Sequence, residues 1–169
     1  MELQRVIDRL RTEVQSGQRI GTNNPPTGQT GAAMMTGINR QPHLQINLTQ
    51  SRTEVSRARA ATTRALKDLG FPELIDDARL IVSELVTNAL DATAAGRVIF
   101  AVYHNDGRPL VEVWDSETAR RPQPQRPAHM AQGGRGLLVV EELAADWGHH
   151  LAQLTPNGPP WKCVWALLK

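Results

Sequence analysis

The sequence predicts an α/β fold, because its apolar residues alternate between helical spacing and strand-like spacing along the chain. From residue 44 onward, the expected order is strand, helix, helix, strand, strand, helix, strand, strand. The 169 residues fit one domain with an appendage. A domain near this size buries about 70% of the surface that its unfolded chain exposes, so a substantial core is expected.

The N-terminal part divides into two segments that precede the expected domain of residues 44–169. Residues 1–15 predict a short amphipathic helix, with apolar side chains at helical spacing: Leu3, Val6, Ile7, Leu10 and Val14. A helix of this length is marginal in water, so it needs the main domain, a second copy in a homodimer or a partner to pack against. Residues 16–43 are rich in Gly, Pro, Asn and Thr and predict a flexible linker.

The first strand and helix of the domain follow directly. Residues 44–49 alternate apolar and polar side chains, which is typical of a half-buried strand. Residues 52–69 predict a helix, with Ser51 and Glu54 as a capping box and Gly70 as its stop.

A second helix is expected from Pro72 to Gly96, and the later elements alternate again. Its buried stripe is predicted to be Leu74, Ala78, Ile81, Val82, Leu85 and Ala89. Residues 105–107, Asn-Asp-Gly, are strong hairpin residues between two strands. The remaining expected segments are strands 97–104 and 109–115, a polar loop 116–132, a Gly-rich turn and helix 133–148, and strands 149–155 and 161–169.

Composition excludes several classes of protein. The chain has 19 Lys and Arg against 17 Asp and Glu, and it lacks a dense basic run, so a direct nucleic-acid interface is not indicated. Cys163 is the only cysteine, which excludes an intramolecular disulfide and a cysteine-based zinc site. No apolar run approaches the roughly 18 residues of a membrane span, and the N-terminus lacks a signal-peptide core. A cytoplasmic protein is therefore expected.

Glu84 and Asn88 are four residues apart in an otherwise apolar helix, so they share one helical face. A carboxylate beside an amide oxygen can seat Mg²⁺, which prefers hard oxygen ligands. The carboxylate can also accept a proton from an attacking hydroxyl. The alternative is an ordinary pair of surface residues.

Two further features carry possible chemistry. Asp115 ends a strand, where a carboxylate can accept a hydrogen bond from an exocyclic amine such as that of adenine; alternatively it only starts a turn. "GGRG" at 133–136 opens a helix, where glycines allow a phosphate to approach the free N–H groups and Arg135 adds charge. The pattern is neither a P-loop nor a dinucleotide fingerprint, and the alternative is a simple turn.

Together, in this order, these motifs resemble the GHKL ATPases, and within them the anti-sigma-factor-type serine kinases. "SELVTNAL" resembles the N box, "VEVWD" the start of the first glycine box, and "GGRGLLVVEELAADWG" the second glycine box with its helix. The closing "WKCVWALL" is similar to the last strand of that family. The resemblance covers about residues 44–168.

The resemblance implies a two-layer α/β sandwich, with a mixed, mostly antiparallel sheet covered by helices on one face. It implies ATP and Mg²⁺ as cofactors, Glu84 as the catalytic base, Asn88 as the Mg²⁺ ligand and Asp115 as the adenine-binding residue. Residues 116–132 would form the ATP lid. The other implied cofactor-binding residues are Gly133, Gly134, Arg135, Gly136 and Leu137, and Cys163, which stands where the family frequently has a threonine near adenine.

The implied activity is transfer of the ATP γ-phosphate to a Ser or Thr of an anti-sigma antagonist partner, linked to control of a sigma factor. Two departures keep a rival open. The first box is "DSETA", without the family's glycines, and a thiol at Cys163 is a weak hydrogen-bonding substitute. The rival is a regulator that binds nucleotide weakly or not at all and sequesters its partner. A third option is an ATPase switch without a protein substrate, and Asp91, near Asn88, has no assigned role.

Overall fold

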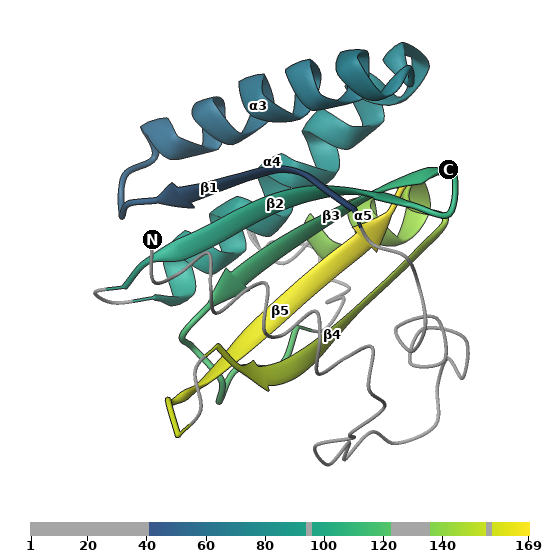
Figure 1. Ribbon diagram of the computed structural model, residues 1–169. Helices are drawn as coiled ribbons and strands as arrows, with labels where there is room; N and C mark the ends of the chain where they lie inside the picture. The colour runs from purple at the N-terminus through teal and green to yellow at the C-terminus, as the bar shows by residue number, and fades with distance from the viewer. Residues whose placement is uncertain (1–40, 94–95, 123–135, 155–156) are drawn as a thin grey trace, which may run out of the picture.

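The structure is a computed structural model that describes residues 41–93, 96–122, 136–154 and 157–169 (Figure 1). The expected N-terminal helix and nearly all of the linker lie outside these residues. The described elements, in chain order, are β1 (Gln41–Leu48), α3 (Thr53–Leu69), the 3₁₀ turn η1 (Pro72–Leu74), α4 (Ile75–Ala92), β2 (Val98–Asn105), β3 (Arg108–Asp115), α5 (Gly136–Leu143), β4 (Asp146–Gln153) and β5 (Pro160–Leu167). This order of strands and helices confirms the sequence prediction.

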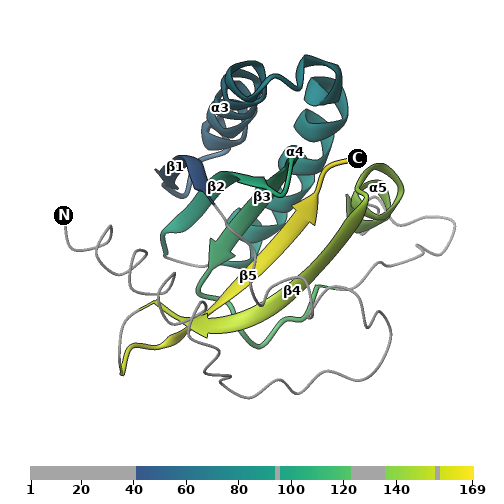
Figure 2. The same ribbon diagram turned by 45° about the vertical axis from the view of Figure 1, so that its right-hand side comes forward.

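The strands form one five-stranded sheet in the order β1-β2-β3-β5-β4. Every described neighbouring pair is antiparallel, so the sheet is not mixed as the resemblance implied. Helices α3, α4 and α5 lie on one face of this sheet, which gives a two-layer α/β sandwich (Figures 1 and 2). The fold class is thus confirmed. Among the described residues, no helix is both long and apolar enough to span a bilayer.

The main core fills the space between the helices and the sheet. Helix α4 supplies the predicted stripe except for Leu74, which is the last residue of η1 and is partly exposed. Successive strand residues point to opposite faces of a sheet. On β3, Val111 and Val113 therefore face the helices, and Val164 and Ala166 do so on β5. This alternation decides which functional side chains can meet at the helix-covered face.

The helix ends differ in detail from the predictions. Gly70 ends α3 as expected, with φ of +85° and its N–H donated to the Lys67 carbonyl. The capping box does not form: the Ser51 hydroxyl accepts from the N–H of Thr53 at 3.3 Å, and the Glu54 carboxylate binds Thr49 and Arg57. A polar side chain near the start of a helix can hydrogen-bond several local groups. The Glu54 carboxylate bonds Thr49 and Arg57 instead of the backbone N–H of Ser51.

Helix α4 stops at Ala92 rather than at Gly96, because Thr93 already has an extended backbone. Helix α5 stops at Leu143 rather than near residue 148, and β4 begins at Asp146. Trp147 packs against the main core, and Gly148 lies under the Trp165 ring. Sheet contacts thus override the helical pattern of this segment.

The β2–β3 hairpin confirms the prediction from Asn-Asp-Gly. Asp106 and Gly107 have φ of 46° and 81°, the paired positive values that a type I′ turn requires. The tight turn fixes the pairing of β2 with β3, and through it the position of Asp115 at the far end of β3.

Candidate functional site

Glu84 and Gly136, 52 positions apart in the sequence, are in contact where α4 packs against α5. A Cβ atom added to Gly136 would stand 3.1 Å from Cδ and 3.4 Å from Cβ of Glu84. The carboxylate Oε2 would be closer still, at a separation that real Cβ atoms essentially never show, so the half-buried Glu84 carboxyl lies directly against the glycine backbone. The structure therefore joins two of the motifs that the sequence singled out.

Gly136 is also the first residue of α5, so Glu84 lies beside the N-terminus of that helix. The first four N–H groups of a helix have no partner within it, and they carry a partial positive charge. The Leu137 side chain is buried in the main core, which leaves the backbone of Leu137 as the part available for binding. Gly133, Gly134 and Arg135 lie outside the described residues, so their predicted phosphate contacts stay predictions.

Asn88 lies one turn beyond Glu84 on α4, and its side chain is exposed. Asp91 points elsewhere: its carboxylate meets the Arg52 guanidinium, at the start of α3, at 3.3 Å. That exposed ion pair gives Asp91 a partner away from the Glu84 side. Within the described ranges, no group of three or more His, Cys, Asp or Glu is placed to hold a metal.

An Mg²⁺ site at Asn88 would therefore depend on few protein ligands. Mg²⁺ commonly binds through one or two side chains, with substrate phosphates and water completing its shell. The exposed Asn88 amide oxygen fits that arrangement. It would hold the ion on the same helical face as the Glu84 carboxylate.

Asp115 is buried at the end of β3, with 1% of its surface exposed, and it shares the helix-facing side with Val113. Its Oδ1 accepts the N–H of Glu117 at 2.8 Å and lies 3.2 Å from the Nζ of Lys162. Lys162, the opposite residue on β5, is also buried. This ion pair is not among the features that the sequence predicts.

The Lys162 ammonium does more than pair with Asp115. It also donates to the carbonyl of Glu117 at 2.6 Å and to that of Arg120 at 3.3 Å. The loop that the resemblance assigns as the ATP lid starts at residue 116, so Lys162 fixes its first turn to the sheet. These contacts order a segment that lacks the family's glycines.

Burial is the largest influence on Asp115 and raises the pKa of its carboxyl. The Lys162 charge and hydrogen bond act in the opposite direction and lower that pKa. The Lys162 ammonium therefore offsets part of the effect of burial on this carboxyl group. An adenine amine that approaches Asp115 would share the carboxylate with this ammonium.

His149 is a second residue that sequence reasoning missed. It pairs with Val164 across β4 and β5, so its side chain shares the helix-covered side of the sheet with Lys162. Burial lowers the pKa of His149, and the nearby charges of Arg121 and Lys162 lower it further. A half-buried, neutral imidazole thus lies near the Asp115–Lys162 pair.

We expect this histidine to make stability depend on pH. Because the pKa of His149 is lower in the folded chain than its usual value of 6.5, the unfolded chain takes up a proton first as the pH falls. The free energy of unfolding should therefore decrease as the pH falls below about 6.5, and less so in His149→Gln. Denaturant unfolding at several pH values measures this slope. Identical slopes in the native chain and in His149→Gln would show that His149 does not cause the pH dependence.

Cys163 does not lie with these residues. Strand alternation turns it to the sheet face away from the helices, where it is fully buried between the neighbouring strands' Trp114 and His150. Those two rings meet edge to face, 5.3 Å between centroids. Its predicted part in adenine binding has no support from this placement. The β5 residue on the helix-covered side is Lys162, one position earlier.

One signal could have revealed Lys162: a lysine inside an otherwise apolar strand, directly beside the cysteine that the sequence analysis chose. Its pairing with Asp115 depends on the antiparallel register of β3 and β5. That register joins segments 47 residues apart and is not readable from local pattern.

The fold and the contacts around Glu84 define an α/β sandwich with a site at the N-terminus of α5. A family model described as the histidine kinase-like ATPase domain matches residues 48–158, more than half of the chain. The chain belongs to this family of ATP-binding, kinase-like ATPase domains. No curated protein matches it.

Gly136→Ala tests the contact at the centre of the site. We expect the variant to lose about 1–3 kcal/mol of unfolding free energy, because the new methyl group overlaps the Glu84 side chain. Denaturant unfolding measures the loss. In Glu84→Ala the same glycine substitution should be nearly neutral, since the space is then free. An equal loss in both backgrounds would show that the two residues do not touch.

Proposed function

We propose that this chain is a serine/threonine protein kinase of the anti-sigma-factor type. It would transfer the γ-phosphoryl group of ATP to a hydroxyl of a small antagonist partner. The observation that carries the proposal is the Glu84 carboxyl against Gly136, at the N-terminus of α5. A proton acceptor and a phosphate-binding helix end are then neighbours, as phosphoryl transfer requires.

In the proposed reaction, the Glu84 carboxylate accepts the proton of the partner's hydroxyl group. The hydroxyl oxygen forms a bond to the γ-phosphorus, while the bond from that phosphorus to the bridging oxygen breaks and ADP leaves. The α5 N–H groups face the charge that spreads over the phosphate oxygens. Mg²⁺, held in part by Asn88, would supply charge neutralisation, and the remaining contribution of the protein is positioning.

One observation favours a second candidate function, a weak nucleotide binder that acts by sequestering its partner. The Lys162 ammonium, 3.2 Å from Oδ1 of Asp115, already contacts the carboxylate that would recognise adenine. Binding of the base then has to compete with a buried ion pair. A regulator in which this ion pair only holds the loop after β3 in place would need no nucleotide.

Calorimetric titration with ATP, with and without Mg²⁺, separates the two candidates. The kinase proposal expects binding that Mg²⁺ strengthens and that Asp115→Asn weakens. Asp106→Asn is a matched control, because Asp106 is exposed in the hairpin turn and an asparagine tolerates its positive φ. Absence of binding heat in the native chain would favour the sequestering regulator.

Incubation with γ-labelled ATP, Mg²⁺ and candidate antagonist proteins then tests the transfer itself. Label on a Ser or Thr of the added protein supports the kinase. Release of free phosphate without labelled protein would indicate the ATPase switch instead.

A further inference from the structure

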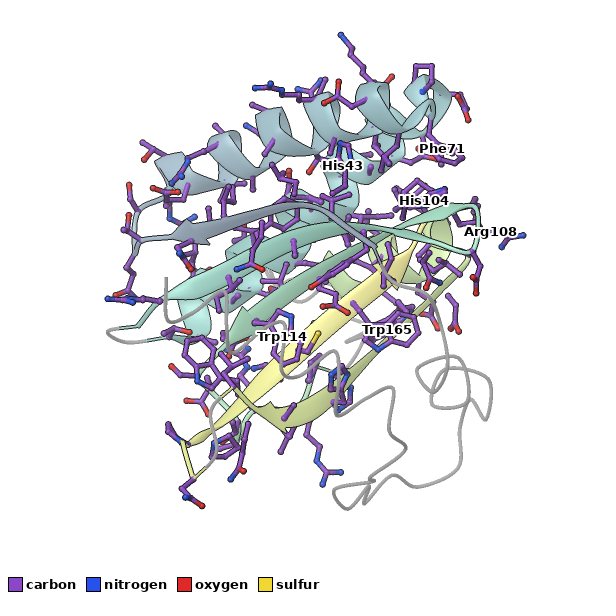
Figure 3. All side chains as sticks on the ribbon, viewed as in Figure 1. His43, Phe71, His104, Arg108, Trp114 and Trp165 are labelled. Carbon is purple, nitrogen blue, oxygen red and sulfur yellow. The ribbon has the colours of Figure 1, made fainter. Side chains whose placement is uncertain are left out.

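The sheet face turned away from the helices carries a second apolar cluster. It is well buried, each member being at most 8% exposed: Ala101, Tyr103, Leu110, Cys163, Trp165 and Leu167. Trp114 packs against it. Figure 3 shows Trp114 and Trp165 on this face, opposite to α3. We call this set of residues the open-face cluster.

None of the described helices lies on this side of the sheet (Figure 2). Trp165 shows why that matters. Its ring lies flat over Gly148, where an added Cβ atom would stand 3.1 Å from its Cε2, so strand β4 covers one face of the ring. Only 6% of Trp165 is exposed. The open-face cluster is thus an apolar sheet face that none of the described helices covers.

Glu112 indicates which kind of segment could cover the open-face cluster. It lies on the same face as the open-face cluster, is 1% exposed and accepts a hydrogen bond from Trp114 Nε1 at 3.0 Å. A buried carboxylate is stabilised by nearby positive charge and destabilised by a purely apolar cover. Such a segment should therefore combine an apolar stripe with basic side chains.

We propose that residues 1–40 of the same chain cover the open-face cluster, with residues 2–15 as an amphipathic helix across the sheet. The apolar stripe of that segment matches the cluster. Arg5, Arg9 and Arg11 alternate with Glu2, Asp8 and Glu13, and an arginine of this set can pair with Glu112. A 14-residue helix is about 21 Å long at 1.5 Å per residue. Five strands about 4.8 Å apart span roughly 19 Å, so the lengths agree.

The point where the segment joins the domain also fits. Gln41, the first residue of β1, pairs with His104 beside the β2–β3 hairpin. Tyr103 and Leu110 of the open-face cluster face each other at that same end. The 25 residues from 16 to 40 reach up to about 80 Å when extended, far more than the crossing needs. Because the segment is tethered, its effective concentration at the sheet is of millimolar order, which favours it over a second copy.

The test uses the full chain with Ile7→Asp and Leu10→Asp, which place two charges in the apolar stripe. A matched control carries Gln4→Asp and Thr12→Asp, outside the stripe. We expect the stripe variant, and not the control, to show red-shifted tryptophan emission and stronger acrylamide quenching, because Trp165 becomes exposed. In a Trp165→Phe background, the difference between stripe variant and control should shrink.

Thermal unfolding followed by circular dichroism shows whether the domain of the stripe variant is intact. Should it not fold, Leu10→Ala is the milder substitution, with the same expected direction. Unchanged emission and quenching in a folded stripe variant would overturn the proposal. A second result would also overturn it. If light scattering gives the native chain the mass of a dimer, and if Trp165 becomes exposed on dilution, a second copy of the chain is the cover.

Discussion

Glu84→Gln is expected to abolish phosphoryl transfer while leaving ATP binding nearly intact. The amide keeps the size of the carboxylate and its contact with Gly136, but it cannot accept the hydroxyl proton. Loss of a general base lowers a rate by about 10²–10⁴-fold. Rates with γ-labelled ATP and an identified partner, together with calorimetric affinities, measure the two effects separately.

Glu141→Gln is the matched control, because Glu141 is exposed on α5. It should transfer phosphate at the native rate. If Glu84→Gln also does so, Glu84 is not the base, even if the chain proves to be a kinase. If both rate and affinity fall together, the role of Glu84 is to shape the pocket.

Lys162→Met is expected to cause the largest loss of stability among single substitutions at the site. It leaves the Asp115 carboxylate, 1% exposed, without its ammonium partner. Removal of one member of a buried ion pair typically costs about 3–5 kcal/mol. The carbonyls of Glu117 and Arg120 lose a donor as well. Denaturant unfolding at neutral pH measures the loss.

The pH dependence gives this prediction its signature. Without Lys162, burial raises the pKa of Asp115 further, since the influence that lowers it is gone. The folded variant then holds a proton that the unfolded chain has released. Its stability should recover as the pH falls toward the usual carboxyl range and decline as the pH rises. Lys169→Met, at an exposed lysine, should show neither effect.

The double variant Lys162→Met, Asp115→Asn should regain part of the lost stability, because no buried charge remains. A double variant as unstable as Lys162→Met alone would mean that the pair contributes through the loop contacts of Lys162. The single variant Lys162→Met also bears on function. An ATP affinity that rises in Lys162→Met would show that the ammonium competes with the base, as the sequestering candidate assumes.

The sequence alone predicted the order of elements and the buried side of α4, because both follow from local periodicity. The hairpin at Asp106 and Gly107 was predictable for the same reason, since few residues accept positive φ. The neighbourhood of Glu84 and Gly136 was predictable only through the resemblance. No periodicity states that α4 and α5 pack with these two residues in contact.

Features that depend on pairing between distant strands escaped prediction. The partner of Asp115 is set by the β3–β5 register, which also turns Cys163 to the far face and Lys162 toward the site. The early end of α5 follows from the sheet contacts of Trp147 and Gly148. These sheet contacts outweigh the helical pattern of the segment, and the local sequence pattern gives no sign of them.

The central claim is that ATP binds where α4, α5 and the end of β3 meet. Photolabelling with an azido derivative of ATP, followed by peptide mapping, tests it most directly. We expect ATP-competitive label on the peptides that contain Glu84 and Asn88, Asp115, or Gly136 and Leu137, and a loss of label in Asp115→Asn. Label that ATP displaces only from peptides remote from these three segments would contradict the account.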